Sequence, residues 1–358
     1  MTLPKTFVES EPKSTRQSRQ KPKRPRKGRT ALVVIAVLVV AAAVLAGGYL
    51  WSLASAFDSA SQKIESAFPA ESSRPQKAEP PAGQKSAINI LILGSDSRGS
   101  AEFDSVQGSA TDQRADTLML LNIPADRKNV YTMSIMRDLW VPIPGKGEAK
   151  VNAALALGGV PLMVQTVESL FDQRIDHVAM VDFQGFKGLT DALGGVQISV
   201  STPFTSTHGG YTFTAGPNTM NGEQALGFVR ERYAFADGDY QRVRNQQQFL
   251  KAVVDKTASA DTLTNPAKIS GVVSSLSPYV SVDRDFNSSA VAALGLELNG
   301  VRQQDISMFT LPTAGIGTST DGQSIVLPDT AAIADISAAL AQDKLRDYIA
   351  ANKLEKGN

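Results

Sequence analysis

The pattern of apolar and polar residues divides the chain into five parts. The run from Ala31 to Trp51 holds no charged side chain, and at ~1.5 Å per helical residue it is long enough to cross a hydrocarbon core of ~30 Å. The next 35 or so residues mix Ser, Ala, Pro, Gln, Lys and Glu without apolar periodicity, as flexible linkers do. We therefore expect an N-terminal tail over residues 1–30, a transmembrane helix over 31–51, a flexible stalk over 52–86, one folded domain over 87–345 and a C-terminal tail over 346–358.

Within the predicted domain, strand and helix patterns alternate. Short apolar runs bounded by glycine or polar residues predict strands over 88–93, 117–123, 129–135, 177–183, 196–200 and 306–311. Helical spacing predicts helices over 160–171, 221–232 and 238–256, with shorter ones over 186–193, 264–275, 287–297 and 329–339. The turn PADRK joins the second and third strands as a hairpin. This order predicts an α/β fold, a three-layer α/β/α domain with a mixed central sheet.

The charge distribution orients the chain across a membrane. Residues 1–30 carry ten Lys and Arg but only Glu9 and Glu11 as acids, although the net charge of the whole chain is only +1. The positive-inside rule therefore predicts a cytoplasmic N-terminus and an extracellular domain, with the helix as a single-pass anchor in the cell membrane. Tyr49 and Trp51 suit the membrane interface, and the run is longer than the apolar region of a cleaved signal. The exported part is acidic on balance, so we expect no nucleic-acid partner.

Several kinds of chemistry are excluded or disfavoured. The chain has no cysteine, which removes disulfides, zinc thiolate sites and thiol nucleophiles. His177 and His208 lie far apart and outside any HExxH spacing, so we interpret both as core or surface residues. Walker, GxGxxG and GxSxG motifs are absent from the sequence.

Acidic residues lie where two predicted strands meet polar loops. Asp96 and Arg98 follow the first strand, and Asp116 directly precedes the second. Adjacent strand ends can bring the two aspartates together, and their oxygens suit a hard divalent cation such as Mg²⁺. Capping or turn aspartates would have the same spacing, so both interpretations stay open.

Arginines gather at a strand end and on two successive helices. Arg137 and Asp138 end the third strand, and Arg230 and Arg232 end the helix that Asn221 caps. The next helix adds Asp239, Arg242, Arg244 and Gln246. Grouped guanidinium groups repel one another unless an anion lies among them, and they bind phosphate oxygens in pairs, which indicates a polyanionic ligand. A solvated basic face paired with Asp237 and Asp239 is the alternative.

Several sequence blocks carry a family resemblance. They are NILILGSDSR at 89–98, RADTLMLL at 114–121, SIMRDLWVPIPG at 134–145, KVNAALALGG at 150–159, FQGFKGLTDALGGV at 183–196 and NGEQALGFVRERYAFADGDYQRVRNQQQFLKA at 221–252. In this order they resemble the LytR-CpsA-Psr proteins, cell-envelope glycopolymer ligases with a membrane anchor and one exported α/β/α domain. The match extends over most of the predicted domain.

The resemblance implies a set of site residues. Asp96 and Asp116 would hold Mg²⁺ or another divalent cation such as Mn²⁺. The pyrophosphate of the substrate would be bound by Arg98, Arg114, Arg137, Arg230, Arg232, Arg242 and Gln246. Catalytic roles would fall to Arg137, Arg114 and Asp138, with Asp138 or an acid near the metal accepting a proton. The chain departs from the family pattern at Met136, in place of Pro, and at Asn245, in place of Arg, where Arg244 would compensate.

The implied reaction is phosphoryl transfer of a glycopolymer from a polyprenyl-pyrophosphate carrier to a hydroxyl of peptidoglycan or another wall glycan. Its partners would be the lipid-linked glycan, the glycan acceptor and, through the N-terminal helix, membrane lipid. We expect apolar residues within 153–186 to form a slot for the polyprenyl chain. The alternatives are a polyprenyl-pyrophosphate hydrolase that uses the same site and a non-catalytic envelope binding or signalling protein.

Overall fold

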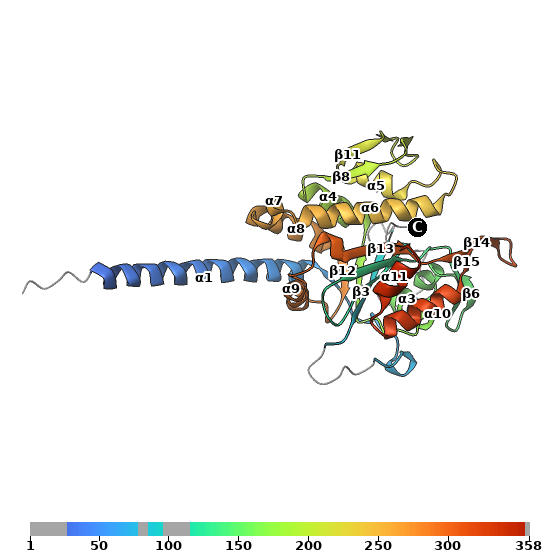
Figure 1. Cartoon of the computed structure of the whole chain (residues 1–358), viewed down its shortest axis with the longest axis horizontal. Helices are drawn as coiled ribbons and strands as arrows, with labels where there is room; N and C mark the ends of the chain where they lie inside the picture. Colours follow the sequence, from blue (N-terminus) through green and yellow to red (C-terminus); the bar gives the residue numbers. More distant parts are fainter. Residues whose placement is uncertain (1–26, 78–84, 96–114, 355–358) are drawn as a thin grey trace, which may run out of the picture. The chain divides into compact units, whose positions relative to one another are not determined.

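The computed structural model describes residues 27–77, 85–95 and 115–354, without the side chains of 27–43, 260 and 263. The chain divides into two units, residues 1–50 and 51–358. Helix α1 (Lys27–Ala60) contains the whole run predicted to cross the membrane (Figure 1). Within that run, the side chains of Val44, Leu45, Leu50 and Trp51 are 63 to 75% exposed. The helix thus presents apolar side chains outward, and its membrane insertion stays a prediction.

Among the described residues, one other helix has the length and hydropathy of a membrane span. This helix, α3 (Ala153–Phe171), has 61% of its apolar window buried inside the structure. Its buried side chains include Met163, Val164 and Phe171, which belong to the main core. We therefore assign α3 to the core of the domain.

The central sheet of the second unit has seven strands in the order β1-β12-β7-β2-β3-β4-β13. Their bounds are β1 (Gln62–Ile64), β2 (Ile88–Ser95), β3 (Ala115–Ile123), β4 (Val130–Ser134), β7 (His177–Val181), β12 (Val280–Asp283) and β13 (Ile306–Thr310). Parallel and antiparallel pairs both occur: β2 pairs parallel with β7 and antiparallel with β3. The predicted mixed sheet is confirmed, and so is the hairpin of β3 and β4.

Helices cover both faces of this sheet. They are α4 (Phe183–Ala192), α5 (Gly222–Arg230), α6 (Asp239–Thr257), α7 (Ala260–Leu263), α8 (Pro266–Leu276), α9 (Ser288–Glu297), α10 (Thr330–Ala341) and α11 (Leu345–Ala351), together with α3. Leu91 and Leu118 contribute to the main core with α3 and α10, whereas Ile90 and Ile123 pack with residues of α9. Neighbouring side chains of a strand point to opposite faces, so strands covered on both sides must be apolar throughout.

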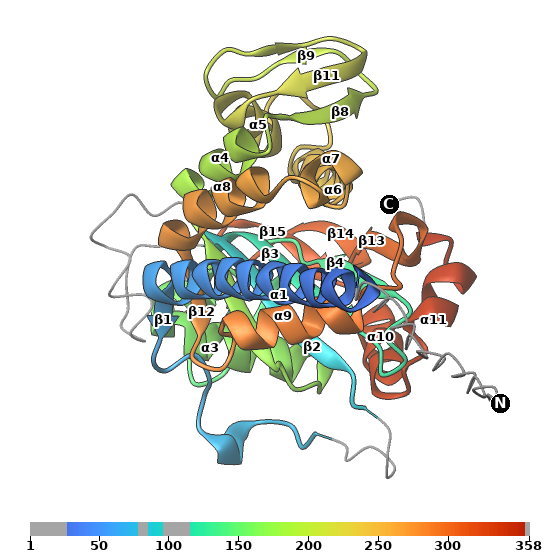
Figure 2. The same ribbon diagram turned by 90° about the vertical axis from the view of Figure 1, so that its left-hand side faces the viewer.

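A second, smaller layer lies apart from the central sheet. The predicted strand over 196–200 is β8 (Val196–Val200), but it pairs with β11 (Gly216–Met220) and does not join the main sheet. Figures 1 and 2 show α4, α5 and α6 between this pair and the central sheet. The remaining strand pairs are β5 (Trp140–Ile143) with β6 (Gly147–Lys150), β9 (Phe204–Thr205) with β10 (Thr212–Phe213), and β14 (Thr313–Thr318) with β15 (Ser324–Pro328).

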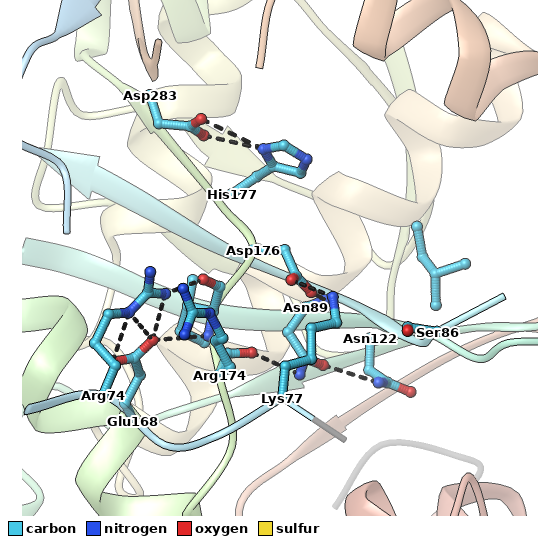
Figure 3. A network of polar contacts seen from close by, with 12 residues as sticks. Arg74, Lys77, Ser86, Asn89, Asn122, Glu168, Arg174, Asp176, His177 and Asp283 are labelled. Atoms are coloured by element: carbon cyan, nitrogen blue, oxygen red, sulfur yellow. Dashed lines mark hydrogen bonds and ion pairs between the residues drawn. The ribbon is translucent and has the colours of Figure 1, made fainter. Parts of the chain in front are cut away.

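The prediction of a flexible stalk over 52–86 is wrong for the part that the structure describes. β1 adds to the edge of the central sheet, and Ile64 is 1% exposed within the main core. Arg74 then pairs with Glu168 of α3, with Nη2 2.6 Å and Nε 3.0 Å from Oε1 (Figure 3). The segment shows no periodicity because a strand edge and an ion pair hold it, and both partners lie far away in the sequence.

The predicted C-terminal tail over 346–358 is also too long. Residues 345–351 form α11, and Leu345, Ile349 and Leu354 are between 2 and 7% exposed in the main core. Within α11 only Leu345 and Ile349 are buried, too few for a periodic signal. The folded unit therefore continues to residue 354, the last one described.

Candidate active site

A pocket of about 430 Å³ lies beside the C-terminal end of β2 and the N-terminal end of β3, with walls from α4, α5 and α6. Its apolar wall includes Ile92, Met119, Phe186, Leu226, Phe249 and Leu250. Its polar wall includes Asp116, Arg137, Arg230, Arg232, Arg242 and Gln246. The structure thus gathers six of the predicted site residues at one pocket, which joins a cationic wall to an apolar one.

Two carboxylates hold three of these arginines. Arg137 donates from Nη1 to Asp116 Oδ1 at 2.6 Å and from Nε to Asp239 Oδ2 at 3.2 Å. The other oxygen of Asp239 lies 3.4 Å from Arg232 Nη1 and 3.5 Å from Arg242 Nη1. Asp239 is therefore the central carboxylate of the cluster. In the sequence, the only sign of this role is that Asp239 lies three residues before Arg242. The same spacing is found in ordinary ion pairs on the surface of a helix.

Charge and burial oppose each other in this cluster. Burial acts to raise the pKa of Asp239, but Arg242 and Arg137 outweigh it and lower that pKa. Burial acts to lower the pKa of Arg137, yet Asp239 and Asp116 raise it. For Arg242, burial together with the repulsion from Arg137 prevails over Asp239, and its pKa is lowered. Among the arginines bound by these carboxylates, Arg242 is thus the one whose pKa is lowered, chiefly by its burial.

Arg242 also has an unused hydrogen-bond donor. The residue is only 5% exposed, and its Nε is buried without a hydrogen-bond partner among the described residues. Buried polar groups in proteins are almost always hydrogen-bonded. Arg242 lines the pocket, and a guanidinium whose hydrogen-bonding capacity is not used up by the protein is suited to bind an anion there.

The end of α5 places two arginines on one wall. Asn221 begins the helix with a capping box that Gln224 completes. After Arg230, the carboxylate of Glu231 accepts the backbone N–H groups of three successive residues, at 2.7 to 3.0 Å. The backbone therefore turns, and both Arg230 and Arg232 line the pocket, as predicted for a helix end. Arg230 also stacks over Phe183 at 4.6 Å.

Other predicted residues lie elsewhere. Asp138 is not among the residues that line the pocket; its carboxylate lies 3.2 Å from Lys150 Nζ and 3.7 Å from Arg137 Nε. Arg244 pairs with Asp237 and likewise does not line the pocket, so it does not compensate for Asn245. Asn245 instead ties α6 to α5, donating from Nδ2 to the carbonyl of Phe228 at 3.0 Å.

The predicted metal site is described in part. Asp96, Arg98 and Arg114 lie outside the described residues. Asp116 lies on the pocket wall and offers carboxylate oxygens, the donors that Mg²⁺ prefers. Both neighbouring arginines approach the same oxygen, Oδ1, at 2.6 and 4.0 Å. Within the described ranges, no group of three His, Asp or Glu residues could hold a metal ion.

The apolar wall differs from the one predicted over 153–186. Residues of α3 belong to the main core, and only Val181, Asp182, Phe183 and Phe186 of that range line the pocket. The remaining apolar wall comes from β2, β3, α4, α5, α6 and α8. The core and the pocket wall are equally apolar, so the sequence could not distinguish them.

Two pocket residues were missed or dismissed at the sequence level. His208, interpreted as a core or surface residue, lines the pocket beside Arg230 and Arg232. Asp182 also lines it and caps α4, accepting from the N–H of Gly185 at 2.7 Å. Burial raises the pKa of Asp182. Neither residue belongs to a recognisable spacing, since the chain reverses between β9 and β10 before His208 meets α5.

These features define a mixed α/β domain with a cationic and amphipathic pocket. The model of the LytR_cpsA_psr family matches residues 52–342, and the chain belongs to this family. The match begins at residue 52, within α1, and so includes β1, which agrees with the place of that strand in the folded unit.

Named relatives show the same kinship. The chain is 27% identical over 279 residues to the cell wall biosynthesis protein LcpA of Corynebacterium glutamicum, covering 68% of this chain and 53% of LcpA. It thus spans about half the length of that relative. It is 33% identical over 245 residues to the polyisoprenyl-teichoic acid–peptidoglycan teichoic acid transferase TagU of Oceanobacillus iheyensis, covering 67% of this chain and 70% of TagU.

Solved structures share the fold. The crystal structure of B. subtilis TagV is similar with a TM-score of 0.60 and 25% identity, covering 73% of this chain and 98% of that one.

Proposed function

We propose that this chain transfers a glycopolymer from a polyprenyl-pyrophosphate carrier to a hydroxyl of peptidoglycan or another wall glycan. The observation that carries the proposal is the pocket itself, in which four arginines face an apolar wall. A diphosphate attached to an isoprenoid chain has the same two-part chemistry. The transferase activity named for TagU, a relative 33% identical, supports this assignment.

The chemistry is a displacement at phosphorus. The acceptor hydroxyl attacks the phosphorus that carries the glycan, a new P–O bond forms, and the bond to the polyprenyl phosphate breaks with its electron pair on the leaving group. Arg137, Arg232 and Arg242 neutralise charge on the two phosphates in the transition state. The product is a glycan joined to its acceptor by a phosphodiester.

A divalent cation, Mg²⁺ or Mn²⁺, completes the proposed site, with Asp96 and Asp116 as its ligands. Such an ion supplies Lewis-acid stabilisation of phosphate oxygens when bound. The position of Asp116 on the pocket wall supports this assignment. Removal of the metal with EDTA and re-addition of Mg²⁺ should abolish and restore transfer. Mg²⁺ should also raise the thermal stability of the wild type but not of Asp116→Asn.

The proposed setting is the outer face of the cell membrane, with residues 31–51 as a single-pass anchor and the N-terminus in the cytoplasm. Since the chain has no cysteine, single cysteines can report topology. In intact cells, an impermeant maleimide should label Ser72→Cys, an exposed position of the folded unit, and should label Ser18→Cys only after permeabilisation. Labelling of Ser18→Cys in intact cells would contradict the orientation.

The assay for the proposed function uses the purified full chain in detergent with Mg²⁺, a synthetic polyprenyl-pyrophosphate glycan and peptidoglycan oligomers. Glycan attached to the oligomer supports the transferase. Glycan phosphate released into solution indicates the hydrolase, and unchanged substrate with tight binding indicates a non-catalytic binding protein. The last two outcomes would each replace the proposal.

A further inference from the structure

A histidine, a threonine and a glutamate form a hydrogen-bonded chain that ends at the pocket. Thr207 Oγ1 donates to Glu231 Oε2 at 3.0 Å and lies 3.3 Å from His208 Nδ1. Nδ1 itself lies 3.7 Å from the same carboxylate oxygen. His208 lines the pocket beside Arg230 and Arg232, the two arginines that flank Glu231. The hydrogen-bonded series of Glu231, Thr207 and His208 therefore leads from a buried carboxylate to the cationic wall of the pocket.

The carboxylate at the inner end is held in its charged form. The side chain of Glu231 is fully buried, and it accepts the N–H of Thr207, the hydroxyl of Thr207 and three backbone N–H groups from residues 232–234. Although burial acts against the charge, these donors lower the pKa of Glu231 to about 2. Glu231 is thus an acceptor only, at any physiological pH.

This arrangement determines the tautomer of His208. The hydroxyl proton of Thr207 is directed to Glu231, so Oγ1 can only accept from the imidazole. The proton of neutral His208 therefore resides on Nδ1, and Nε2 carries the lone pair. Burial, and after it the charge of Arg230, lowers the pKa of His208, with Arg232 acting in the same direction and Glu231 against it. The imidazole is neutral at physiological pH and able to take up a proton.

We propose that His208 is the general base of the transfer, with Thr207 and Glu231 as its positioning residues. The inference rests on the proposed function. The proton of the acceptor hydroxyl moves to Nε2 as the oxygen forms its bond to phosphorus, and the bond to the leaving polyprenyl phosphate breaks. The imidazolium so formed is stabilised by Glu231 and loses its proton to solvent. Asp138 is less suited to this role, since its carboxylate is paired with both Lys150 and Arg137 and does not line the pocket.

The test is the pH dependence of transfer by the full chain in detergent. Wild-type kcat/KM should rise with pH through one ionisation below the ordinary pKa of histidine, ~6.5. His208→Gln should lower kcat by about 10²- to 10⁴-fold with little change in KM, and should abolish that ionisation. Added imidazole should restore part of the rate to His208→Ala. Glu231→Gln should shift the ionisation to lower pH, because a negative charge near the imidazole is removed.

The matched control is Thr212→Ala. Thr212 is an exposed threonine of β10, and the one hydrogen bond described for its hydroxyl is with Thr205 of β9. This variant should keep both the rate and the ionisation. Wild-type rate and an unchanged acid limb in His208→Gln would overturn the inference while leaving the proposed function intact. Loss of inorganic pyrophosphate binding by His208→Gln would also count against it, because His208 would then be a binding or structural residue. Absence of transfer by the wild type would reject the proposed function itself.

Discussion

Two buried arginines of this molecule differ in what surrounds them. Arg74, in the network of Figure 3, has a side chain that is 6% exposed, and it donates from Nε and Nη2 to the carboxylate oxygens of Glu168. Arg242, in the pocket, is equally buried, yet its Nε has no hydrogen-bond partner among the described residues. The first arginine is satisfied by its protein partner, whereas the second retains a donor for something else.

The difference separates a stabilising ion pair from a binding site built of the same residue types. Breaking a buried pair leaves an uncompensated charge, which costs folding energy. A cluster with more guanidinium groups than carboxylates gives up some of that stability, because its charges are balanced only when an anion arrives. Strained or undercompensated groups of this kind are expected at functional sites.

The largest effect should follow from Arg137→Ala. This change removes the guanidinium that joins Asp116 and Asp239, and with it direct stabilisation of the phosphates. We expect the transfer rate to fall by about 10³- to 10⁵-fold, measured as initial rate with the lipid-linked glycan. Arg137→Lys should recover only a small part, since an ammonium cannot reach both carboxylates. Full activity in Arg137→Ala would remove this residue from the site.

The second prediction concerns Arg74, the arginine whose donors are paired with Glu168. Arg74→Ala leaves Glu168, 1% exposed, without its cation and should lower the free energy of unfolding by about 3 to 5 kcal/mol. Urea unfolding of the full chain in detergent measures this loss. The double variant Arg74→Met with Glu168→Gln should recover much of it. Transfer per folded molecule should be unchanged in both, and a selective loss of catalysis would contradict the division between the two regions.

The third effect concerns Glu231, whose folded pKa of about 2 lies below its ordinary value of 4.5. A carboxyl whose pKa is lowered in the folded state stabilises the fold at pH values above its ordinary pKa. This contribution is lost as the pH falls toward 2. The free energy of unfolding of the wild type should exceed that of Glu231→Gln by at most about 3 kcal/mol at pH 7. This difference should narrow as the pH falls from 4.5 to 2. A gap independent of pH would show that charge is not its cause.

The smallest effect should be seen with inorganic pyrophosphate as a probe. Binding at the guanidinium of Arg242 should stabilise the wild type against heat, and Arg242→Met should lose about 2 kcal/mol of the binding free energy, the contribution of hydrogen bonds to a charged group. Calorimetric titration of both proteins measures the difference. Arg302→Met, a change on the exposed surface, is the control and should bind like the wild type.

The regular elements of the domain were predictable, because local patterns determine them. The strand over 196–200 has the predicted bounds, and the helix capped by Asn221 begins where that N-cap indicates. The local pattern could not predict which strand each strand pairs with. β8 pairs with β11 and not with the main sheet, and β1 has only three residues, too few to show an alternating pattern.

The part of the site made of arginines at strand and helix ends was predictable from the sequence. The part that depends on contacts between residues distant in sequence was not. Arginines at strand and helix ends are conspicuous, and Arg137, Arg230 and Arg232 do meet at the pocket. The role of Glu231 is not visible in the sequence, because its five donors come from a turn after α5 and from Thr207, 24 positions earlier. His208 reaches the pocket through the same contact.

The strand at the edge of the sheet also imposes an order of assembly. Gln62 of β1 aligns with Ser281 of β12, so the partner of this early segment is synthesised more than two hundred residues later. Pairs so distant in sequence are slow to form, because their loop must close before the contact is gained. The segment that follows the apolar run therefore waits unpaired during synthesis. Its docking onto the sheet must therefore follow the synthesis of β12.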